Sequence, residues 1–260
     1  MGPDSAGAEP AILDGRAPGA GKTRRQAFYT RRMKALILAA GRGERMRPLS
    51  DLTPKPLLEV GGRKLVEWHL EALARAGIRD VVINTAWLEE QFPAALGDGS
   101  RYGVRIAYSC EGRDHGGALE TAGGIAKALP LLGDVFWIVS GDIYAPDFPF
   151  AQADADDFIA SGALGQLWFV PNEPWHPGGD FGIDARGHAS RDAEPRRTYA
   201  NFALLRAALF RDIVPGTRLA MRPKLEEALD ADALRGKMWD KPWFNIGTPQ
   251  QLDEVRQRRG

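Results

Sequence analysis

The feature that most constrains the fold is an alternation of apolar runs and helical patterns between residues 33 and 142. A short apolar run bounded by polar residues is typical of a strand covered on both faces. Such runs predict strands at 34–40, 80–86, 104–111 and 135–142. The segments between them have apolar residues at helical spacing and predict helices at 64–78, 87–99 and 119–132. This order predicts an α/β fold, a Rossmann-like and mostly parallel sheet flanked by helices.

The second half of the chain is predicted to enlarge that sheet. Strand-like segments at 163–170, 180–187 and 199–206 are separated by turns such as DARG, and helical patterns follow at 219–230 and 248–259. Neither an internal repeat nor a linker divides the region 33–260. We therefore expect a single domain with a smaller extension of the same sheet.

Composition excludes several classes of function. Lys and Arg together number 34, and Asp and Glu together also number 34. The chain therefore has no excess of basic residues that would indicate a nucleic-acid partner. No stretch reaches the roughly 18 apolar residues of a membrane span. The single Cys110 excludes a disulfide framework and favours a reducing compartment. We expect a cytoplasmic protein with neither nucleic-acid nor membrane partners.

Residues 1–32 form a separate segment, rich in Gly, Ala, Pro and Arg, with no apolar period. They predict a disordered N-terminal extension, or a start codon assigned upstream of Met33. The segment contains GAGKT at 19–23, which resembles the end of a P-loop. A P-loop needs a glycine five residues before Gly21 and a preceding strand, and Arg16 stands there instead.

The segment 38–58, LAAGRGERMRPLSDLTPKPLL, follows the first predicted strand. A dinucleotide-binding GxGxxG pattern would need a third glycine at position 46, which is Met46. A glycine-containing loop after a sheet strand still suits phosphate, because backbone N–H groups can approach an anion closely. Arg45 and the proline-flanked Lys55 add two cations to this loop. A solvated basic loop is the alternative, but the combination favours a phosphate site.

The full stretch LAAGRGERMRPLSDLTPKPLLEVGG resembles the signature of the sugar-1-phosphate nucleotidyltransferases. Further stretches agree with the resemblance, namely VINTAW (82–87), YSCEG (108–112), LETAGG (119–124), SGDIY (140–144) and WFNIGTPQQL (243–252). Within the family, LETAGG, INTAW and the short C-terminus are most similar to the uridylyltransferases that act on N-acetylmuramate 1-phosphate.

The resemblance implies a set of site residues. The catalytic residues would be Arg45, Lys55 and Asp142. The implied nucleotide-binding residues are Ala40, Gly41, Gly43, Glu44, Arg45, Lys55, Thr121, Gly123, Gly124 and Ser140. Gly123 and Gly124 would open a helix and approach the base and ribose. Glu111 and Asp180 would contact the sugar substrate.

The implied cofactor is Mg²⁺, held by Asp142 and Asn245. The family usually has Asp at the second position, in a W-x-D-x-G-T context, whereas this chain has WFNIGT. Asn supplies an oxygen without charge, so the triphosphate would contribute the missing anions.

The implied reaction transfers a nucleotidyl group from UTP, or another nucleoside triphosphate, to a sugar 1-phosphate with release of pyrophosphate. If the sugar substrate is N-acetylmuramate 1-phosphate, as the resemblance implies, the reaction belongs to cell-wall sugar recycling. Mannose-1-phosphate guanylyl transfer, glucose-1-phosphate thymidylyl or uridylyl transfer, and a non-catalytic sugar-nucleotide-binding protein stay open as alternatives. Arg113, Arg186 and Arg191 are open candidates for the lactyl carboxylate of muramate. A monomer or small homo-oligomer is expected.

Overall fold

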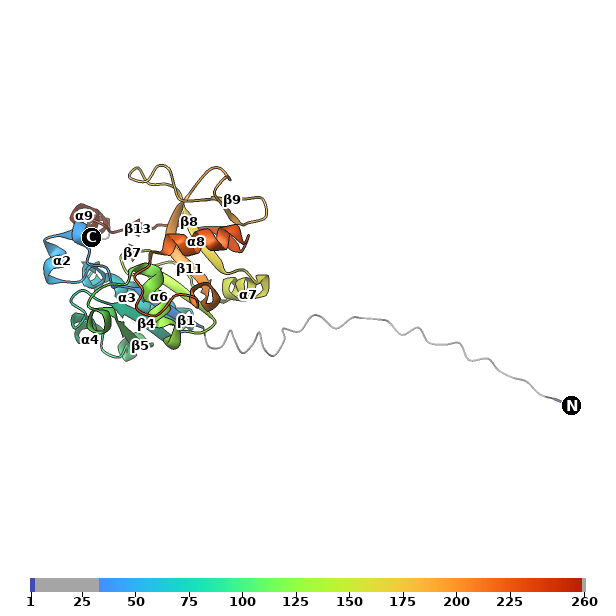
Figure 1. Ribbon diagram of the computed structural model, residues 1–260, viewed down its shortest axis with the longest axis horizontal. Coiled ribbons are helices and arrows are strands. Elements are labelled where there is room, and N and C mark those ends of the chain that lie inside the picture. Colours follow the sequence, from blue (N-terminus) through green and yellow to red (C-terminus); the bar gives the residue numbers. More distant parts are fainter. Residues whose placement is uncertain (3–32, 259–260) are drawn as a thin grey trace.

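The computed structural model describes residues 1–2 and 33–258. The predicted extension at 1–32 and its GAGKT stretch therefore lie outside the described residues, apart from Met1 and Gly2. Seven strands form one sheet in the spatial order β12-β8-β11-β6-β1-β4-β5 (Figure 1). Their bounds are β1 Lys34–Leu38, β4 Asp80–Thr85, β5 Arg105–Cys110, β6 Val135–Ser140, β8 Gly165–Val170, β11 Thr198–Arg206 and β12 Leu234–Met238.

The sheet is mostly parallel. β1 pairs in parallel with β4 on one side and β6 on the other, and β5 continues from β4. β11 is antiparallel to both β6 and β8, and β12 returns to a parallel pairing with β8. The chain runs outward from β1 to β5 and then crosses to β6, so the strand order reverses beside β1. The predicted fold class is thereby confirmed.

Alternate residues of the central strands face two separate hydrophobic clusters, as the two-residue period of a strand requires. Ala35 and Ile37 of β1 face one cluster, and Leu36 faces the other. The first cluster includes residues of α3 Leu65–Arg75, α4 Gln91–Leu96 and α7 Gln152–Ser161. The second includes residues of α6 Glu120–Ala128 and α8 Met221–Asp230. Helices therefore cover both faces of the sheet.

Short elements complete the chain around this sheet. They are α2 Leu49–Leu52, β2 Glu59–Val60, β3 Arg63–Lys64, α5 Glu111–His115, β7 Ile143–Tyr144, β9 Gly182–Ile183, β10 Ala189–Ser190, β13 Phe244–Asn245 and α9 Pro249–Gln257. A third hydrophobic cluster joins Leu252 and Val255 of α9 to Met46 and Val60. The C-terminal helix thus holds the segment that follows the glycine loop.

Two predicted elements differ from the structure, and one strand of the structure was not predicted. The expected strand 180–187 shrinks to β9, which pairs only with β10, because the DARG turn intervenes. The expected helix 87–99 is confined to α4. β12 was not predicted, because only its first residue, Leu234, is buried and the rest of LRGKM lacks a strand-like apolar pattern. Within the described residues, no helix is long and apolar enough to cross a membrane.

Candidate active site

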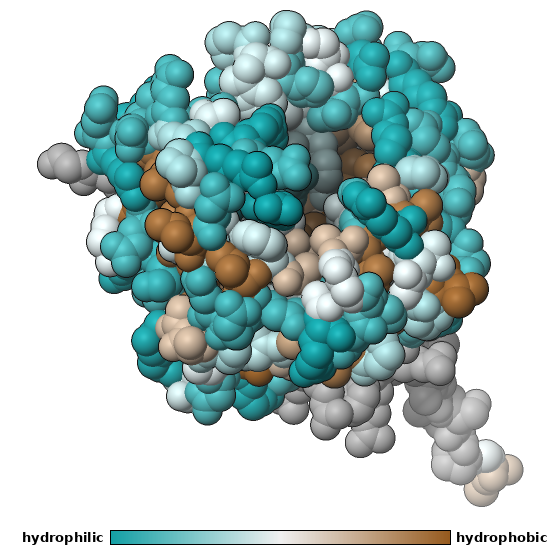
Figure 2. Space-filling view, turned by 60° about the vertical axis from the view of Figure 1, so that its left-hand side comes forward, coloured by the Kyte–Doolittle hydropathy of each residue, from teal (hydrophilic) through white to brown (hydrophobic). Residues whose placement is uncertain are grey.

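A hollow lies at the carboxyl ends of β1, β4 and β6, where the strand order reverses. Open α/β sheets place ligands at this point. The cavity has a volume of about 780 Å³. Figure 2 shows a face with a hollow near its centre and hydrophilic side chains around it. The cavity is lined by Leu38–Arg45, Lys55, Pro56, Asn84, Ala118, Glu120, Thr121, Ile138, Ser140, Asp142, Asp180, Phe181, Tyr199, Asn201, Arg218, Met221, Arg222, Leu225 and Gly247.

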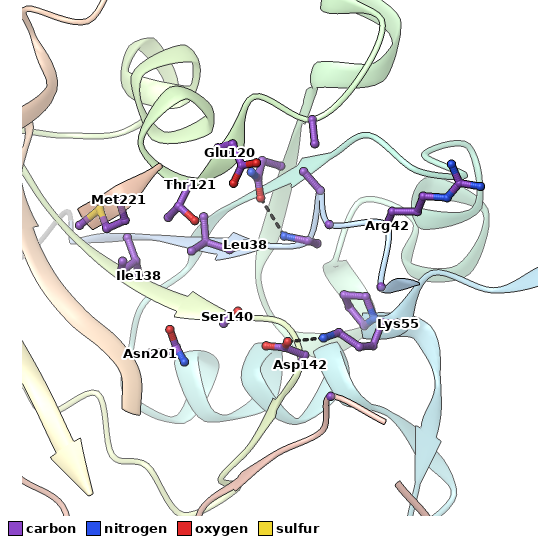
Figure 3. A pocket seen from close by; sticks show the side chains of 18 of the residues that line it. Leu38, Arg42, Lys55, Glu120, Thr121, Ile138, Ser140, Asp142, Asn201 and Met221 are labelled. Atoms are coloured by element: carbon purple, nitrogen blue, oxygen red, sulfur yellow. Dashed lines mark hydrogen bonds and ion pairs between the residues drawn. The ribbon is translucent and has the colours of Figure 1, made fainter. Parts of the chain in front are cut away.

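We call the side formed by Leu38–Arg45, Asn84 and Ala118–Thr121 the loop wall. We call the side formed by Asp180, Phe181, Tyr199, Asn201 and the first residues of α8 the far wall. Lys55 and Asp142 lie at one end of the cavity, whereas Met221 lies at the other, beside Thr121 (Figure 3).

The glycine loop turns sharply at Gly43, whose φ of 66° lies in the left-handed region that favours glycine. The Gly43 carbonyl accepts hydrogen bonds from Ser50 Oγ at 2.7 Å and from Met46 N at 2.8 Å. A Cβ at Gly43 would lie 3.5 Å from the Cβ of Lys55, so the loop and the lysine are in direct contact. The loop backbone and the ammonium can therefore approach one anion together.

Lys55 and Asp142 form an ion pair across the cavity floor (Figure 3). Burial raises the pKa of the Asp142 carboxyl, but the Lys55 ammonium and the Ser140 hydroxyl outweigh it and hold that pKa below its usual range. Pro56 packs against Gly141, where a Cβ would lie 3.0 Å from Pro56 Cγ. This contact fixes the segment carrying Lys55 against the one carrying Asp142.

Two arginines of the glycine loop line the cavity beside this pair. The Arg42 guanidinium carbon lies 4.4 Å from the ring centroid of Trp87. Arg45 lies near Gly247, where a Cβ would be 3.4 Å from Arg45 Nη2. Sequence reasoning identified Arg45 but not Arg42. The Arg42 guanidinium is directed toward Trp87 (Figure 3), whereas Arg45 and Lys55 give one end of the cavity the positive charge that a polyphosphate needs.

A buried chain of hydrogen bonds supports the loop wall, and we call it the relay. Asn84 Oδ1 accepts from Ala39 N at 2.8 Å, and Asn84 Nδ2 donates to Glu111 Oε1 at 2.7 Å. Glu111 Oε2 accepts from Leu119 N at 2.8 Å. Burial raises the pKa of the Glu111 carboxyl, and the two donated hydrogen bonds oppose this rise. The relay ties the start of the glycine loop to the start of α6.

Glu111 is fully buried and does not line the cavity, so the structure does not place it against a sugar. Gly123 and Gly124 lie inside α6 rather than at its opening, and neither lines the cavity. A Cβ at Gly124 would lie 2.8 Å from Asn84 Nδ2 and would overlap the Glu111 carboxylate. A Cβ at Gly123 would overlap the Thr217 carbonyl. Protein atoms, not open space, occupy the room that these two glycines leave.

The segment 217–219 therefore lies directly against α6. Leu219 N donates to the Leu119 carbonyl at 3.0 Å, and Gly123 N donates to the Leu219 carbonyl at 3.1 Å. This contact places Arg218 on the cavity, where its Nη2 lies 2.8 Å from Glu120 Oε1. α8 starts immediately afterwards and carries Arg222 to the far wall.

The far wall contains Asp180, which the resemblance predicts to contact the sugar. Its Oδ2 accepts from Tyr199 N at 2.8 Å, which fixes the carboxylate beside β11. Burial raises the pKa of the Tyr199 phenol above its usual range, and nearby Asp180 adds to the rise. Asn201 lies at the irregularity of β11 with a φ of 59°, uncommon for a residue other than glycine. Strained backbone of this kind is often found at ligand sites.

Asn245 lies on β13, where it pairs with Ile143, the residue after Asp142. Asn245 is not among the cavity-lining residues, although Gly247 is. Within residues 33–258, no cluster of three or more His, Cys, Asp or Glu could hold a metal ion alone. The Asp142 carboxylate, which lines the cavity, together with substrate phosphates suits a hard cation such as Mg²⁺. The donor set thus fits a cation brought with a polyphosphate.

The remaining predicted nucleotide-binding residues, Ala40, Gly41, Glu44, Thr121 and Ser140, all line the cavity. Sequence reasoning missed Asn84, Asn201, Arg218 and Arg222. Asn84 could have been found as a polar residue near the end of a buried strand. Nothing in the local sequence marks Arg218 and Arg222, because they reach the cavity only through the packing of segment 217–219 against α6.

The family model described as nucleotidyl transferase matches residues 34–191. The chain is 43% identical over 232 residues to N-acetylmuramate alpha-1-phosphate uridylyltransferase of Neisseria meningitidis serogroup B, covering 88% of this chain and 99% of that protein. It is 39% identical over 118 residues to UTP–glucose-1-phosphate uridylyltransferase of Synechocystis, covering 42% and 30% of the two chains.

Solved structures share the fold. A protein of Bacillus anthracis, described as a glucose-1-phosphate thymidylyltransferase, aligns with a TM-score of 0.73 at 20% identity over 87% of this chain and 95% of that chain. HddC from Yersinia pseudotuberculosis aligns with a TM-score of 0.68 at 18% identity, over 88% and 100%. At these identities the likeness concerns the fold alone.

Proposed function

The chain belongs to the nucleotidyl transferase family, as the sequence resemblance predicted, and from this premise we propose that it transfers a uridylyl group from UTP to N-acetylmuramate 1-phosphate. The observation that carries the proposal is the 43% identity to the Neisseria protein, which extends over 99% of that protein's length. Pyrophosphate is the second product. The reaction would serve the recycling of peptidoglycan sugars in the cytoplasm.

The proposed step is an in-line displacement. A phosphate oxygen of the sugar 1-phosphate bonds to the α-phosphorus of UTP, the bond from that phosphorus to its bridging oxygen breaks, and pyrophosphate leaves with the electron pair. The attacking phosphate is already ionised near neutral pH, so no general base is required. Transfer of this kind depends on positioning and charge neutralisation.

The cavity supplies those two requirements. In the proposal, Arg45 and the backbone of Gly41 and Gly43 hold the β- and γ-phosphates, and Lys55 contacts the α-phosphate. Ala40, Glu44, Thr121 and Ser140 line the space for the rest of the nucleotide, while Asp180 and Asn201 face the sugar. Glu111, Gly123 and Gly124 support the loop wall from behind instead of contacting a substrate.

We infer that Mg²⁺ accompanies the nucleotide and is held by Asp142, with Asn245 as the neighbouring oxygen donor. When bound, it would neutralise charge on the triphosphate and on the leaving pyrophosphate. Lys55 remains close enough to Asp142 to share that carboxylate or to turn toward an incoming phosphate.

Release of pyrophosphate by the purified protein tests the proposal. UTP, GTP and dTTP are each combined with N-acetylmuramate, glucose and mannose 1-phosphates in the presence of Mg²⁺. We expect the highest kcat/KM for UTP with N-acetylmuramate 1-phosphate. A clear preference for GTP with mannose 1-phosphate, or for a glucose 1-phosphate pair, would refute the substrate assignment.

Substitution tests whether the cavity is catalytic. Lys55→Ala and Asp142→Ala should each reduce turnover by about a hundredfold or more with the fold retained. Lys237→Ala is a matched control, because Lys237 is an exposed lysine that pairs with Asp154 away from the cavity. Nucleotide binding without turnover in the parent protein would favour the non-catalytic alternative.

A further inference from the structure

We propose that Arg222 forms a carboxylate-binding subsite on the far wall, through which the enzyme selects an acidic sugar 1-phosphate over a neutral one. This proposal rests on the function proposed above. N-acetylmuramate is N-acetylglucosamine with a lactyl ether, so the two sugars differ by one carboxylate-bearing group. A cavity that distinguishes them needs a cation placed away from the phosphates.

The three arginines singled out in the sequence are not placed for this role. Arg113 pairs with Asp114, Arg186 pairs with Asp184 and Asp232, and Arg191 pairs with Glu226 and Asp230. None of the three arginines lines the cavity.

The cations that do line the cavity occupy different places. Arg42, Arg45 and Lys55 lie on or beside the glycine loop, where the triphosphate is expected. Arg218 bonds to Glu120 and so lies at the loop wall. Arg222 is the second residue of α8, with its guanidinium carbon 5.0 Å from the ring centroid of Phe181. Phe181 directly follows Asp180, so Arg222 belongs to the wall assigned to the sugar.

Two contacts orient the Arg222 side chain, which is 57% exposed, without using all its donors. Arg222 Nε donates to Glu226 Oε1 at 2.6 Å, and the Phe181 ring packs under the guanidinium. Among the described residues, its two terminal nitrogens donate to no protein acceptor. A guanidinium presents paired N–H groups that match a carboxylate, and stacking on an aromatic ring reduces the conformational freedom lost on binding. Arg222 is thus held ready for an anionic group.

Arg191→Met provides a matched control, because Arg191 and Arg222 both pair with Glu226. Glu226 accepts from Arg222 inside the cavity and from Arg191 outside it. Arg222→Met and Arg191→Met therefore each remove one ion pair with the same carboxylate. Only the first removes a cation from the cavity, and methionine preserves the packing on Phe181. Arg222→Lys retains the charge but loses the paired N–H groups.

The experiment compares N-acetylmuramate 1-phosphate with N-acetylglucosamine 1-phosphate, each with UTP and Mg²⁺. We expect Arg222→Met to lower kcat/KM for the acidic sugar by roughly ten- to a hundredfold and to leave the neutral sugar within about threefold. Arg222→Lys should fall between wild type and Arg222→Met. Arg191→Met should behave as wild type.

The two proposals fail in different ways. If wild type does not transfer a uridylyl group from UTP to N-acetylmuramate 1-phosphate, the proposed function is refuted, and the subsite is refuted with it. If wild type prefers the acidic sugar but Arg222→Met affects both sugars equally, or neither, only the subsite is refuted. Thermal unfolding of each variant separates a local effect from a loss of folding, and an unfolded Arg222→Met leaves Arg222→Lys to decide.

Discussion

Replacement of Glu111 by Gln tests the relay behind the loop wall. At one end of the relay the Ala39 N–H donates to Asn84, and at the other the Leu119 N–H and the Asn84 amide both donate to Glu111. Every hydrogen bond therefore points toward the carboxylate, which accepts through both oxygens. A glutamine at this position has only one acceptor oxygen. In one case the glutamine NH₂ group faces another donor, either the Leu119 N–H or the Asn84 NH₂ group. In the other case the Asn84 amide flips, and its NH₂ group then faces the Ala39 N–H.

The size of the effect follows from burial. Glu111 is fully buried and Asn84 is 3% exposed, so the unmatched donor cannot reach solvent. An unsatisfied buried donor costs about 1–3 kcal/mol. The structure leaves little space for relaxation, because a Cβ at Gly124 would already lie 2.8 Å from Asn84 Nδ2. We expect Glu111→Gln to reduce the free energy of unfolding by about 2 kcal/mol and Tm by roughly 4–8 °C.

Urea and thermal unfolding at pH 7.5 measure this loss, with Glu90→Gln as the control. Glu90 is exposed and makes no hydrogen bond through its side chain in the structure, so its substitution should change stability by less than about 0.5 kcal/mol. The double variant with Asn84→Ala should lose less than the sum of the single variants, because the two residues share one network. Wild-type stability in Glu111→Gln, or additive losses, would show that the relay contributes nothing.

Two further outcomes follow from buried groups elsewhere. Burial lowers the pKa of His69 to about 4 from an ordinary 6.5, so below pH 6.5 the unfolded chain binds a proton that the folded protein excludes. The free energy of unfolding should therefore fall as pH drops from 6.5 toward 4. Between pH 7.5 and 5, urea unfolding of His69→Gln should show a loss of this free energy that is about 2 kcal/mol smaller than in wild type. Equal pH profiles of the two proteins would contradict this. Gly123→Ala should destabilise the protein by about 1–3 kcal/mol, against the usual gain of alanine in a helix, because its Cβ would overlap the Thr217 carbonyl. Gly133→Ala, where the nearest atom to a Cβ lies 3.6 Å away, is the control, and equal effects in thermal unfolding would refute the overlap.

Periodicity predicted the elements in which burial is continuous. β1, β6 and α3 were found from sequence because nearly all of their inward residues are apolar. β12 could not be found in this way, because it is defined by its pairing with β8 and its Met238 is exposed. An edge strand of this kind forms because it pairs with a neighbouring strand, and the local sequence pattern carries no information about that neighbour.

The candidate site was predictable where one contiguous motif carries it. Arg45 and Lys55 stand in a single stretch of sequence and both line the cavity. Gly123 and Gly124 illustrate the limit: a glycine indicates that something approaches the backbone, but not whether a ligand or the protein itself does so. Here Thr217 and Glu111 are the approaching groups. Arg222 marks a second limit, since it enters the cavity only because segment 217–219 lies on α6.

That same segment joins the two sides of the cavity. Arg218 contacts Glu120 of the loop wall, and Arg222, four residues later, contacts Phe181 of the far wall. We predict that a nucleotide that shifts the first contact changes the position of the second, so that the two substrates are energetically coupled through these two arginines. Thermodynamic reciprocity then requires that UTP alters the affinity for the sugar phosphate by the same factor as the sugar phosphate alters the affinity for UTP. Calorimetric titration of either substrate in the presence of a non-reacting analogue of the other would measure this factor, and a factor of one would refute the coupling.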